Sequence, residues 1–457
     1  MLSMRLLPSF FLLLLSATIS PAYAADVPPG PGTLVEGETL EDFFTAAIKY
    51  SPRLQIAEEN FNIGGFRERQ ARGQLLPQVN ANASLTDNRR NSFNQFGNPL
   101  LDEFDGERLS LTLSQALFNW QAWSARKRAS LVENQLEAEY YYELAFLLTD
   151  VAERYLNVLR AEDALTSIAS ELEAITNQRD QIQTLYDLQL AQVTDLRQVE
   201  ASFVAVQAEQ LRLQSELGIA EESLRSITGI DVGELFVLDD AVQLPEISNS
   251  VQYWVQLAEE NNQQIRAQRF AVQAAEEFVA ENKGALYPRV NFIAQRLDSN
   301  IGFDNRFLGD SDTTFVGVDV SIPLYAGGSN RARVSEARSQ KSIAEFELRQ
   351  VELDANQQVR SAYLQAQSSA LLTQAAERLV ESTRISAEAM RQGFELGTVN
   401  NVDVLNAIRD QFQAERDLQQ ARYEQIMFQL LLKREAGVLS AEDILEIGSW
   451  MIEPQIN

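Results

Sequence analysis

The chain of 457 residues contains neither cysteine nor histidine. Without cysteine it can form no disulfide and cannot carry a lipid on an N-terminal cysteine. Without histidine it lacks the commonest general base and every Cys/His set of zinc ligands. No nucleophile–base pair or phosphate-binding loop is visible either, and the scattered acids are typical of solvated helix faces. We therefore expect no enzyme, no catalytic residue, no metal site and no cofactor.

Positive charge and long apolar runs are also scarce. The chain has 38 lysines and arginines against 65 aspartates and glutamates, a formal net charge of −27, which disfavours nucleic acid as a partner. An apolar run at 6–15 follows Arg5 and precedes an A-x-A sequence at 22–24. Because this run is shorter than the ~20 residues of a spanning helix, it predicts a signal peptide over 1–24. No later run reaches spanning length, so only β-strands could cross a membrane.

What the chain does contain is a duplication. Three blocks recur in the same order at offsets of 211, 207 and 208 residues: 73–80 with 284–291, 109–120 with 316–327, and 185–196 with 393–404. Such self-similarity at a nearly constant offset indicates a repeated structural unit. We divide the mature chain into four parts, namely a first repeat (25–230), an inter-repeat equatorial segment (231–248), a second repeat (249–438) and a C-terminal tail (439–457).

Both repeats have the same predicted order of elements. A medium helix (38–75 or 249–286) ends near a proline, which stops a helix. A β-hairpin follows (79–118 or 290–325), and then a long segment without proline. The long segments, 121–188 and 329–396, hold 68 residues each and would reach ~100 Å as helices. Returning helices are predicted over 193–228 and 401–436.

The long helix and the returning helix of the first repeat carry matching apolar positions at 3–4 spacing. The pattern predicts an antiparallel coiled-coil hairpin that bends near 189–192. Arg179 and Gln210 interrupt the two apolar seams. The second repeat keeps this layout with smaller and more polar seam residues.

The predicted strands alternate apolar and polar residues, as in 79–86, 109–114 and 316–324. This alternation suits strands that face lipid on one side and water on the other, although a soluble sheet half-covered by helices would show it too. The segments 87–106 and 298–313 are polar and are predicted to be long loops.

Two further observations favour the membrane. Aromatic residues gather at the strand ends, as in an interfacial belt: Phe118, Trp120, Trp123 and Tyr325. Four strands are too few for a closed barrel, and open sheet edges are not tolerated in lipid. Three chains would supply 3 × 4 = 12 strands. Together with the export signal, this points to the outer membrane of a Gram-negative cell.

Several segments resemble the TolC-type outer-membrane efflux proteins, in both repeats and over essentially the whole mature chain. They are "SIPLYAGGSNRARVSEA" (321–337), "FELGTVNNVDVLNA" (394–407), "LAQVTDLRQVEASFVAVQAE" (190–209), "LRSITG" (224–229) and "ARYEQIMFQLLLKREAGVLSAEDI" (421–444). The resemblance implies an α+β membrane protein. Its duplicated unit gives a long α-helical coiled-coil barrel plus four transmembrane strands per chain, which close a 12-stranded β-barrel only as a trimer.

The resemblance also implies the function and the partners. Such homotrimers form the exit duct for an inner-membrane efflux pump or ABC exporter and its periplasmic adaptor (membrane fusion) protein. They span outer-membrane lipid and export drugs, other toxic small molecules or proteins, the last by type I secretion. The alternative from another class is a soluble periplasmic coiled-coil scaffold without a channel.

In this family the helical hairpins narrow at their periplasmic tips and close the duct. The resemblance places the gate at Thr194 and Asp195 of the first tip and at Asp403 of the second. Three copies of Asp403 would form an anionic ring, which predicts mild cation selectivity at low salt. Both acids lie near helix starts, where helix capping is the alternative role; for Asp195 the two roles stay open.

Three gate positions depart from the family pattern. Phe394 lacks the hydroxyl of the expected tyrosine, Val399 replaces an arginine, and Asn406 replaces a second acid. Asp195 therefore lacks the familiar polar partners, and we expect a duct that closes by packing more than by salt bridges, or closes less tightly.

The resemblance places adaptor docking at the two tips, where the family tends to carry V-G-L or V-G-T. The matching residues are Leu188, Gln189 and Leu190 in the first tip and Leu396, Gly397 and Thr398 in the second. Glycine suits a turn with positive φ, so Gln189 in the glycine position is a departure.

Overall fold

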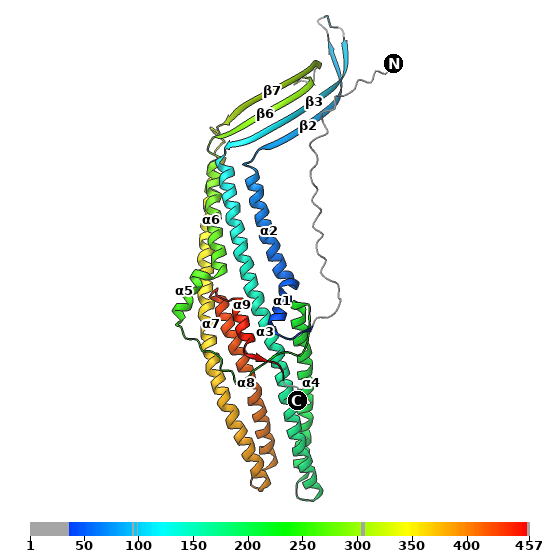
Figure 1. The fold of residues 1–457 in the computed structure, drawn as a ribbon, viewed down its shortest axis with the longest axis vertical. Helices are drawn as coiled ribbons and strands as arrows, with labels where there is room; N and C mark the ends of the chain where they lie inside the picture. The colour runs from blue at the N-terminus through cyan, green and yellow to red at the C-terminus, as the bar shows by residue number, and fades with distance from the viewer. Residues whose placement is uncertain (1–35, 94–95, 98, 303–306, 455–457) are drawn as a thin grey trace, which may run out of the picture.

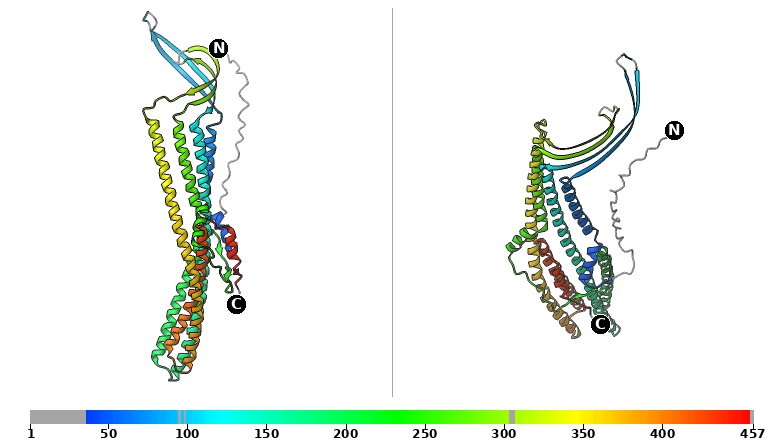
Figure 2. Two further views of the ribbon diagram at one scale, coloured as in Figure 1. Left: turned by 90° about the vertical axis from the view of Figure 1, so that its left-hand side faces the viewer. Right: turned by 45° about the horizontal axis from the view of Figure 1, so that its top comes forward.

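The computed structural model describes residues 36–93, 96–97, 99–302 and 307–454 (Figure 1). A β-sheet stands at one end of the molecule, and long helices run from it to two hairpin tips at the other end. Two views at right angles and at 45° show the same arrangement (Figure 2). The proposed signal peptide lies outside the described residues. Among the helices described, none combines the length and apolarity needed to cross a membrane.

The first repeat contains a short strand, two medium helices, two long strands and two long helices. In chain order they are β1 (Glu36–Gly37), α1 (Leu40–Tyr50), α2 (Pro52–Gly73), β2 (Gln78–Phe93), β3 (Pro99–Phe118), α3 (Trp120–Asp187) and α4 (Val193–Thr228). The short strands β4 (Asp231–Val232) and β5 (Val237–Leu238) follow in the inter-repeat segment.

The second repeat runs through the same order. It contains α5 (Val251–Asn261), α6 (Gln263–Gly284), β6 (Arg289–Ile301), β7 (Phe307–Ser321), α7 (Ser329–Glu395) and α8 (Asn401–Glu435). The C-terminal segment adds α9 (Ala441–Gly448) and β8 (Met451–Ile452). The two long helices hold 68 and 67 residues, which corresponds to ~100 Å each.

The medium helix of each repeat is broken in two, which corrects the prediction of one helix over 38–75 and one over 249–286. Ser51 (ψ 113°) and Asn262 (ψ 123°) leave the helical conformation. Pro52 disfavours the α conformation in the residue before it, so the first break had a sequence signal. At the second break Asn262 caps α6 by accepting from the backbone N–H groups of Gln264 and Ile265.

The long strands form one antiparallel sheet in the order β2-β3-β6-β7. Within the described residues, β2 and β7 pair on one side only. Partners across the ladder share a face, as Val79 with Leu113 and Ala294 with Val316. That face carries exposed apolar side chains: Val79, Leu85, Leu109, Leu111, Val316, Val318 and Val320.

The strands extend into both predicted loops, so the loop predictions over 87–106 and 298–313 were wrong. β2 continues to Phe93 and β3 begins at Pro99, and the salt bridge Arg89–Glu103 joins facing residues of this extension at 2.6 Å. Backbone ladder bonds need no apolar face, so polar residues can continue a hairpin. The β2–β3 hairpin projects beyond β6–β7 (Figure 1).

The second hairpin is shorter than the predicted 290–325, because β7 ends at Ser321. Pro323 has no backbone N–H to donate to a ladder, which explains the early end. Gly327 and Gly328 then take positive φ angles of 61° and 86° before α7 begins.

The predicted coiled-coil hairpin is present in the first repeat. Seam residues from α3 and α4 are buried together, among them Ile168, Ile175, Val199 and Val206. The guanidinium of Arg179, an interruption of the seam, lies 4.6 Å from the ring centroid of Phe203, a favourable cation–π geometry. In the second repeat, small buried residues of α7 allow close packing: Ala355, Ala362, Ala366, Ser369 and Thr373.

A central core ties the two repeats and the C-terminal segment together. Helices α1, α3, α4, α8 and α9 contribute to one buried cluster that includes Phe43, Tyr155, Leu224, Ile426 and Ile447. The hydroxyl of Tyr155 donates to the backbone oxygens of Glu38 and Phe236. The core therefore holds α3 near its middle and α4 and α8 near their C-terminal ends, and both tips extend away from this anchor.

Candidate functional site at the hairpin tips

The turns at the two tips have the same backbone hydrogen bonds. In the first, Leu190 N–H donates to Leu185 O at 2.8 Å, and Gln189 N–H donates to Tyr186 O at 2.9 Å. In the second, the corresponding bonds run from residues 398 and 397 to residues 393 and 394 at 2.9 and 3.0 Å. One bond encloses six residues and the other encloses four, and this pair of bonds defines a Schellman motif.

Gln189 occupies the left-handed position of this motif in the first tip. Its φ is 65°, and the φ of Gly397 in the second tip is 72°. Among the described residues Gln189 is the only non-glycine with positive φ. The departure from glycine therefore leaves the turn geometry unchanged and places a strained side chain at the tip.

The predicted gate acids lie in the first turns of α4 and α8. Asp195 is half-buried, and its carboxylate accepts from Gln192 N–H at 3.2 Å, which is a capping bond. Thr194 is exposed and its hydroxyl donates to the Gln192 side chain. Asp403 is exposed, and its N–H donates to the N-cap residue Asn400 at 3.0 Å. Asp195 thus has the capping role, while within the part of the chain described the carboxylate of Asp403 forms no hydrogen bond or ion pair.

The three positions that depart from the family pattern have different surroundings. Phe394 and Val399 are half-buried against an apolar cluster that joins α3, α4 and α8. Asn406 is exposed on α8 beside Asp403. The members of the cluster that α8 supplies are Val404, Leu405, Ile408 and Phe412. Packing therefore occupies two positions where the resemblance led us to look for polar bonds.

Polar bonds between the hairpins exist at residues that the sequence did not single out. The side chain of Asn401 is 2% exposed. Its Oδ1 accepts from Gln178 Nε2 of α3 at 2.8 Å, and its Nδ2 donates to Asp195 O of α4 at 3.4 Å. The available signal was position: Asn401, Val404, Leu405 and Ile408 follow helical spacing, which puts an amide on the buried face.

A second link joins α3 and α8 closer to the anchor. Arg416 Nη1 donates to Glu171 Oε2 at 2.8 Å, and the Glu171 side chain is 3% exposed. Burial raises the pKa of Glu171, while the bond to Arg416 opposes that shift. A buried pair of this kind costs desolvation and favours one alignment of the two helices.

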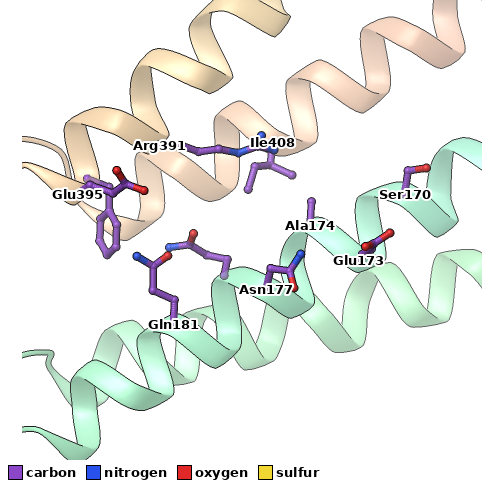
Figure 3. Close-up of a pocket in the computed structure, with 10 residues that line it drawn as sticks. Ser170, Glu173, Ala174, Asn177, Gln181, Arg391, Glu395 and Ile408 are labelled. Carbon is purple, nitrogen blue, oxygen red and sulfur yellow. The ribbon is translucent and has the colours of Figure 1, made fainter.

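A groove of about 370 Å³ opens between the hairpins beside the Gln178–Asn401 bond (Figure 3). Asn177 and Gln181 of α3 face it from one side, and Arg391 and Glu395 of α7 from the other. The lining is polar, so it suits water and hydrogen-bonding groups better than an apolar ligand.

The turns themselves expose apolar side chains. Leu188 is 64% exposed, Leu190 is 73% exposed and Leu396 is 79% exposed. Thr398 is also exposed, and its hydroxyl donates to Gly393 O. No group of three or more acidic residues that could hold a metal ion occurs in the described ranges.

Comparisons with known proteins agree with this architecture. The profile of the outer membrane efflux protein family matches residues 46–230 and 254–437, one match in each repeat. Outer membrane protein TolC of Vibrio cholerae is 26% identical over 425 residues, which cover 92% of this chain and 95% of that protein. The alkaline protease secretion protein AprF of Pseudomonas aeruginosa is 26% identical over 417 residues, covering 89% and 85%.

Solved structures share the fold. The crystal structure of the outer membrane protein VceC from Vibrio cholerae superimposes with a TM-score of 0.74 at 20% identity. The superposition covers 87% of this chain and 96% of VceC.

Proposed function

The chain belongs to the outer membrane efflux protein family, and from this we propose that three copies form an exit duct through the outer membrane and the periplasm. The sheet crosses the outer membrane, and the helices extend into the periplasm with their tips toward the inner membrane. Drugs and other toxic small molecules, or secreted proteins, leave the cell through it. The inner-membrane pump or exporter supplies this cargo.

The observation that carries the proposal is the sheet. It has an apolar exposed face, and β2 and β7 pair on one side only within the described residues. Unpaired strand edges find no water in lipid. Three copies pairing β7 of one with β2 of the next would satisfy these edges and give twelve strands.

The alternative, a soluble scaffold, fits this sheet poorly. The face that carries Val316, Val318 and Val320 would meet water, with each side chain more than half exposed. Contiguous apolar surface of this kind marks contact with lipid or another protein. The scaffold also leaves the duplicated tips without a role.

Fractionation of the producing cell tests the proposal. We expect the protein in the outer-membrane fraction as a detergent-dependent, heat-modifiable trimer that conducts ions in planar bilayers. A water-soluble monomer without channel activity would favour the scaffold.

The tips are proposed to bind the periplasmic adaptor. Leu188, Leu190 and Leu396 are exposed at the far end of the molecule, where an apolar partner surface could bury them. Gln189, Gly397 and Thr398 complete the two turns. Co-purification of the adaptor from cells should fall when Leu396 is replaced by glutamate, and unchanged recovery would place docking elsewhere.

The gate is proposed to lie at the same tips. Asp403 would form the anionic ring and Asn406 would line it one turn further along α8. Thr194 and Asp195 would face it from α4, while Phe394 and Val399 hold the α7–α8 hairpin by packing.

A further inference from the structure

We propose that Asn401 is a neutral latch that holds the α7–α8 hairpin against the α3–α4 hairpin and so keeps the duct closed. The inference rests on the proposed function, and it names residues for which the family pattern gave no expectation. Three groups meet at this position: the Gln178 amide, the Asn401 amide and the backbone oxygen of Asp195.

The first support is burial. Asn401 is 2% exposed and Gln178 is 7% exposed, and the neighbouring interface residues Ile175, Ile182 and Val404 are apolar. A polar side chain in such a place is costly unless it is bonded. Asparagine at a buried helix-packing position is known to fix alignment at a cost in stability.

The second support is the direction of the bonds. The two hydrogen bonds of the Asn401 side chain cross to the other hairpin, one to α3 at 2.8 Å and one to α4 at 3.4 Å. By contrast, the neighbouring Asn400 bonds within its own helix start, accepting from Asp403 N–H. Asn401 therefore contributes to the contact between hairpins, whereas Asn400 contributes to the helix itself.

The third support is location. Asn401 is two residues from Asp403, the proposed constriction, and Gln178 lines the polar groove between the hairpins. When the hairpins separate, water can replace both amide bonds, so opening costs far less than leaving the amides unpaired in the closed state. The latch carries no charge, so its own contribution to closure should depend little on salt between ~0.1 and 1 M.

Single-channel recordings of purified trimers test the latch. Asn401→Leu leaves the buried Gln178 amide without its partner only in the closed state, which favours opening. We expect the ratio of open to closed time to rise about five- to thirtyfold. Gln178→Met, which keeps the side-chain length and removes the amide, should act in the same direction.

The double variant Gln178→Met/Asn401→Leu distinguishes a bond from two independent effects. Replacing both partners by apolar groups costs little, so the double variant should open less than the product of the two single effects. Multiplicative effects would overturn the latch.

Asn400→Ala is the matched control. It removes the N-cap of α8 without touching a bond between hairpins, and we expect its opening ratio to stay within about twofold of the parent. Equal opening by Asn400→Ala and Asn401→Leu would show that fraying of α8 explains both, and would overturn the latch. Heat-modifiable trimers on gels confirm assembly, and if Asn401→Leu does not assemble, Gln178→Met decides alone.

The outcomes separate the two proposals. A parent protein that never conducts contradicts the duct. A parent that conducts while Asn401→Leu and Gln178→Met leave gating unchanged contradicts the latch alone.

Discussion

Gln189 is strained where its counterpart is not. Both tips use the same turn, but Gln189 holds a side chain at φ 65° whereas Gly397 has none at φ 72°. A left-handed conformation costs a residue with Cβ roughly 1–2 kcal/mol. The exposed position of Gln189 and the identical hydrogen bonds show that the surrounding turn imposes it.

Substituting each residue by the other should change the stabilities of the two turns in opposite directions. Gln189→Gly relieves the strain but adds unfolded-state entropy, so we expect the first turn to gain up to about 1 kcal/mol. Gly397→Gln adds the backbone strain of a positive φ. No atom lies within 4 Å of the added Cβ, so no steric clash adds to that strain, and the substitution should cost about 1 kcal/mol. Amide hydrogen exchange at the two turns measures both, and a shift of the same sign at both would contradict the argument.

Folding opposes the ionisation of Glu162, an acid of α3. Burial, with the nearby carboxyls of Asp163, Glu221 and Glu234, raises the pKa of Glu162 from 4.5 to about 7. The native state then holds its proton at pH values where the unfolded chain has released it. Glu162 therefore leaves the free energy of unfolding unchanged below pH 4.5. It lowers this free energy by the full amount above about pH 7.

Glu162→Gln should remove this penalty. The full shift would correspond to roughly 3 kcal/mol, and allowing for the water that still screens the group leaves about 1–2 kcal/mol. We expect the variant to be more stable than the parent at pH 8 and equal to it at pH 4, measured by denaturant unfolding. Glu153→Gln, an exposed acid on the same helix, is the control and should change little. An equal gain at pH 4 would contradict ionisation as the cause.

At the scale of elements, the apolar seam between α3, α4 and α8 decides how the hairpins pair. Ile168, Ile175 and Ile182 repeat at seven-residue intervals along α3 and are all buried. Regular seven-residue spacing keeps one face of a helix toward its partners over several turns. The same face carries Glu171 and Gln178 at the same interval, and these two residues make the polar bonds to α8.

Truncating one seam residue should therefore cost much more than truncating its neighbour. Ile182→Ala removes a side chain that is 1% exposed, and we expect a loss of 2–5 kcal/mol. Gln181→Ala on the adjacent, exposed position should cost within about 0.5 kcal/mol. The midpoint of urea unfolding, followed by circular dichroism, compares them, and equal losses would contradict a buried seam at this tip.

At the scale of the whole molecule, one chain is incomplete. Its sheet has two edges that pair on one side only within the described ranges. Exposed apolar residues also follow α7, including Phe346, Leu353, Leu364 and Leu371. A trimer would cover such surfaces, and it would also bring three copies of the exposed Asp403 together in the proposed ring.

Asp403 should then set ion selectivity. A ring of carboxylates attracts cations, so we expect the trimer to prefer cations at low salt and to lose most of this preference in Asp403→Ala. Asp410 lies seven residues further along α8 and already pairs with Arg409 at 3.1 Å. Asp410→Ala should therefore reduce the cation preference less than Asp403→Ala does. Reversal potentials in a salt gradient provide the measurement. Unchanged potentials in Asp403→Ala would contradict the ring.

The long helices and the strand alternation could be predicted because each depends on local spacing, and the duplication because three blocks recur at a nearly constant offset. The start of α4 at Val193 and the near-equal long helices follow from periodicity and from the proline-free segments. The break at Asn262 and the extension of β2 to Phe93 were not readable. The first depends on bonds from Asn262 to α6 and to Glu435 O, and the second on pairing with β3.

The sequence by itself determined a duplicated chain with four strands and two ~100 Å helical hairpins, because periodicity and helix-breaking residues act within a few residues. The tertiary structure decided which polar groups join the hairpins. Asn401 meets Gln178 across 223 positions of the chain, and no local pattern encodes so distant a contact. Phe394 and Val399 looked like lost bonds in the sequence, whereas the folded chain packs them and makes its polar contacts elsewhere.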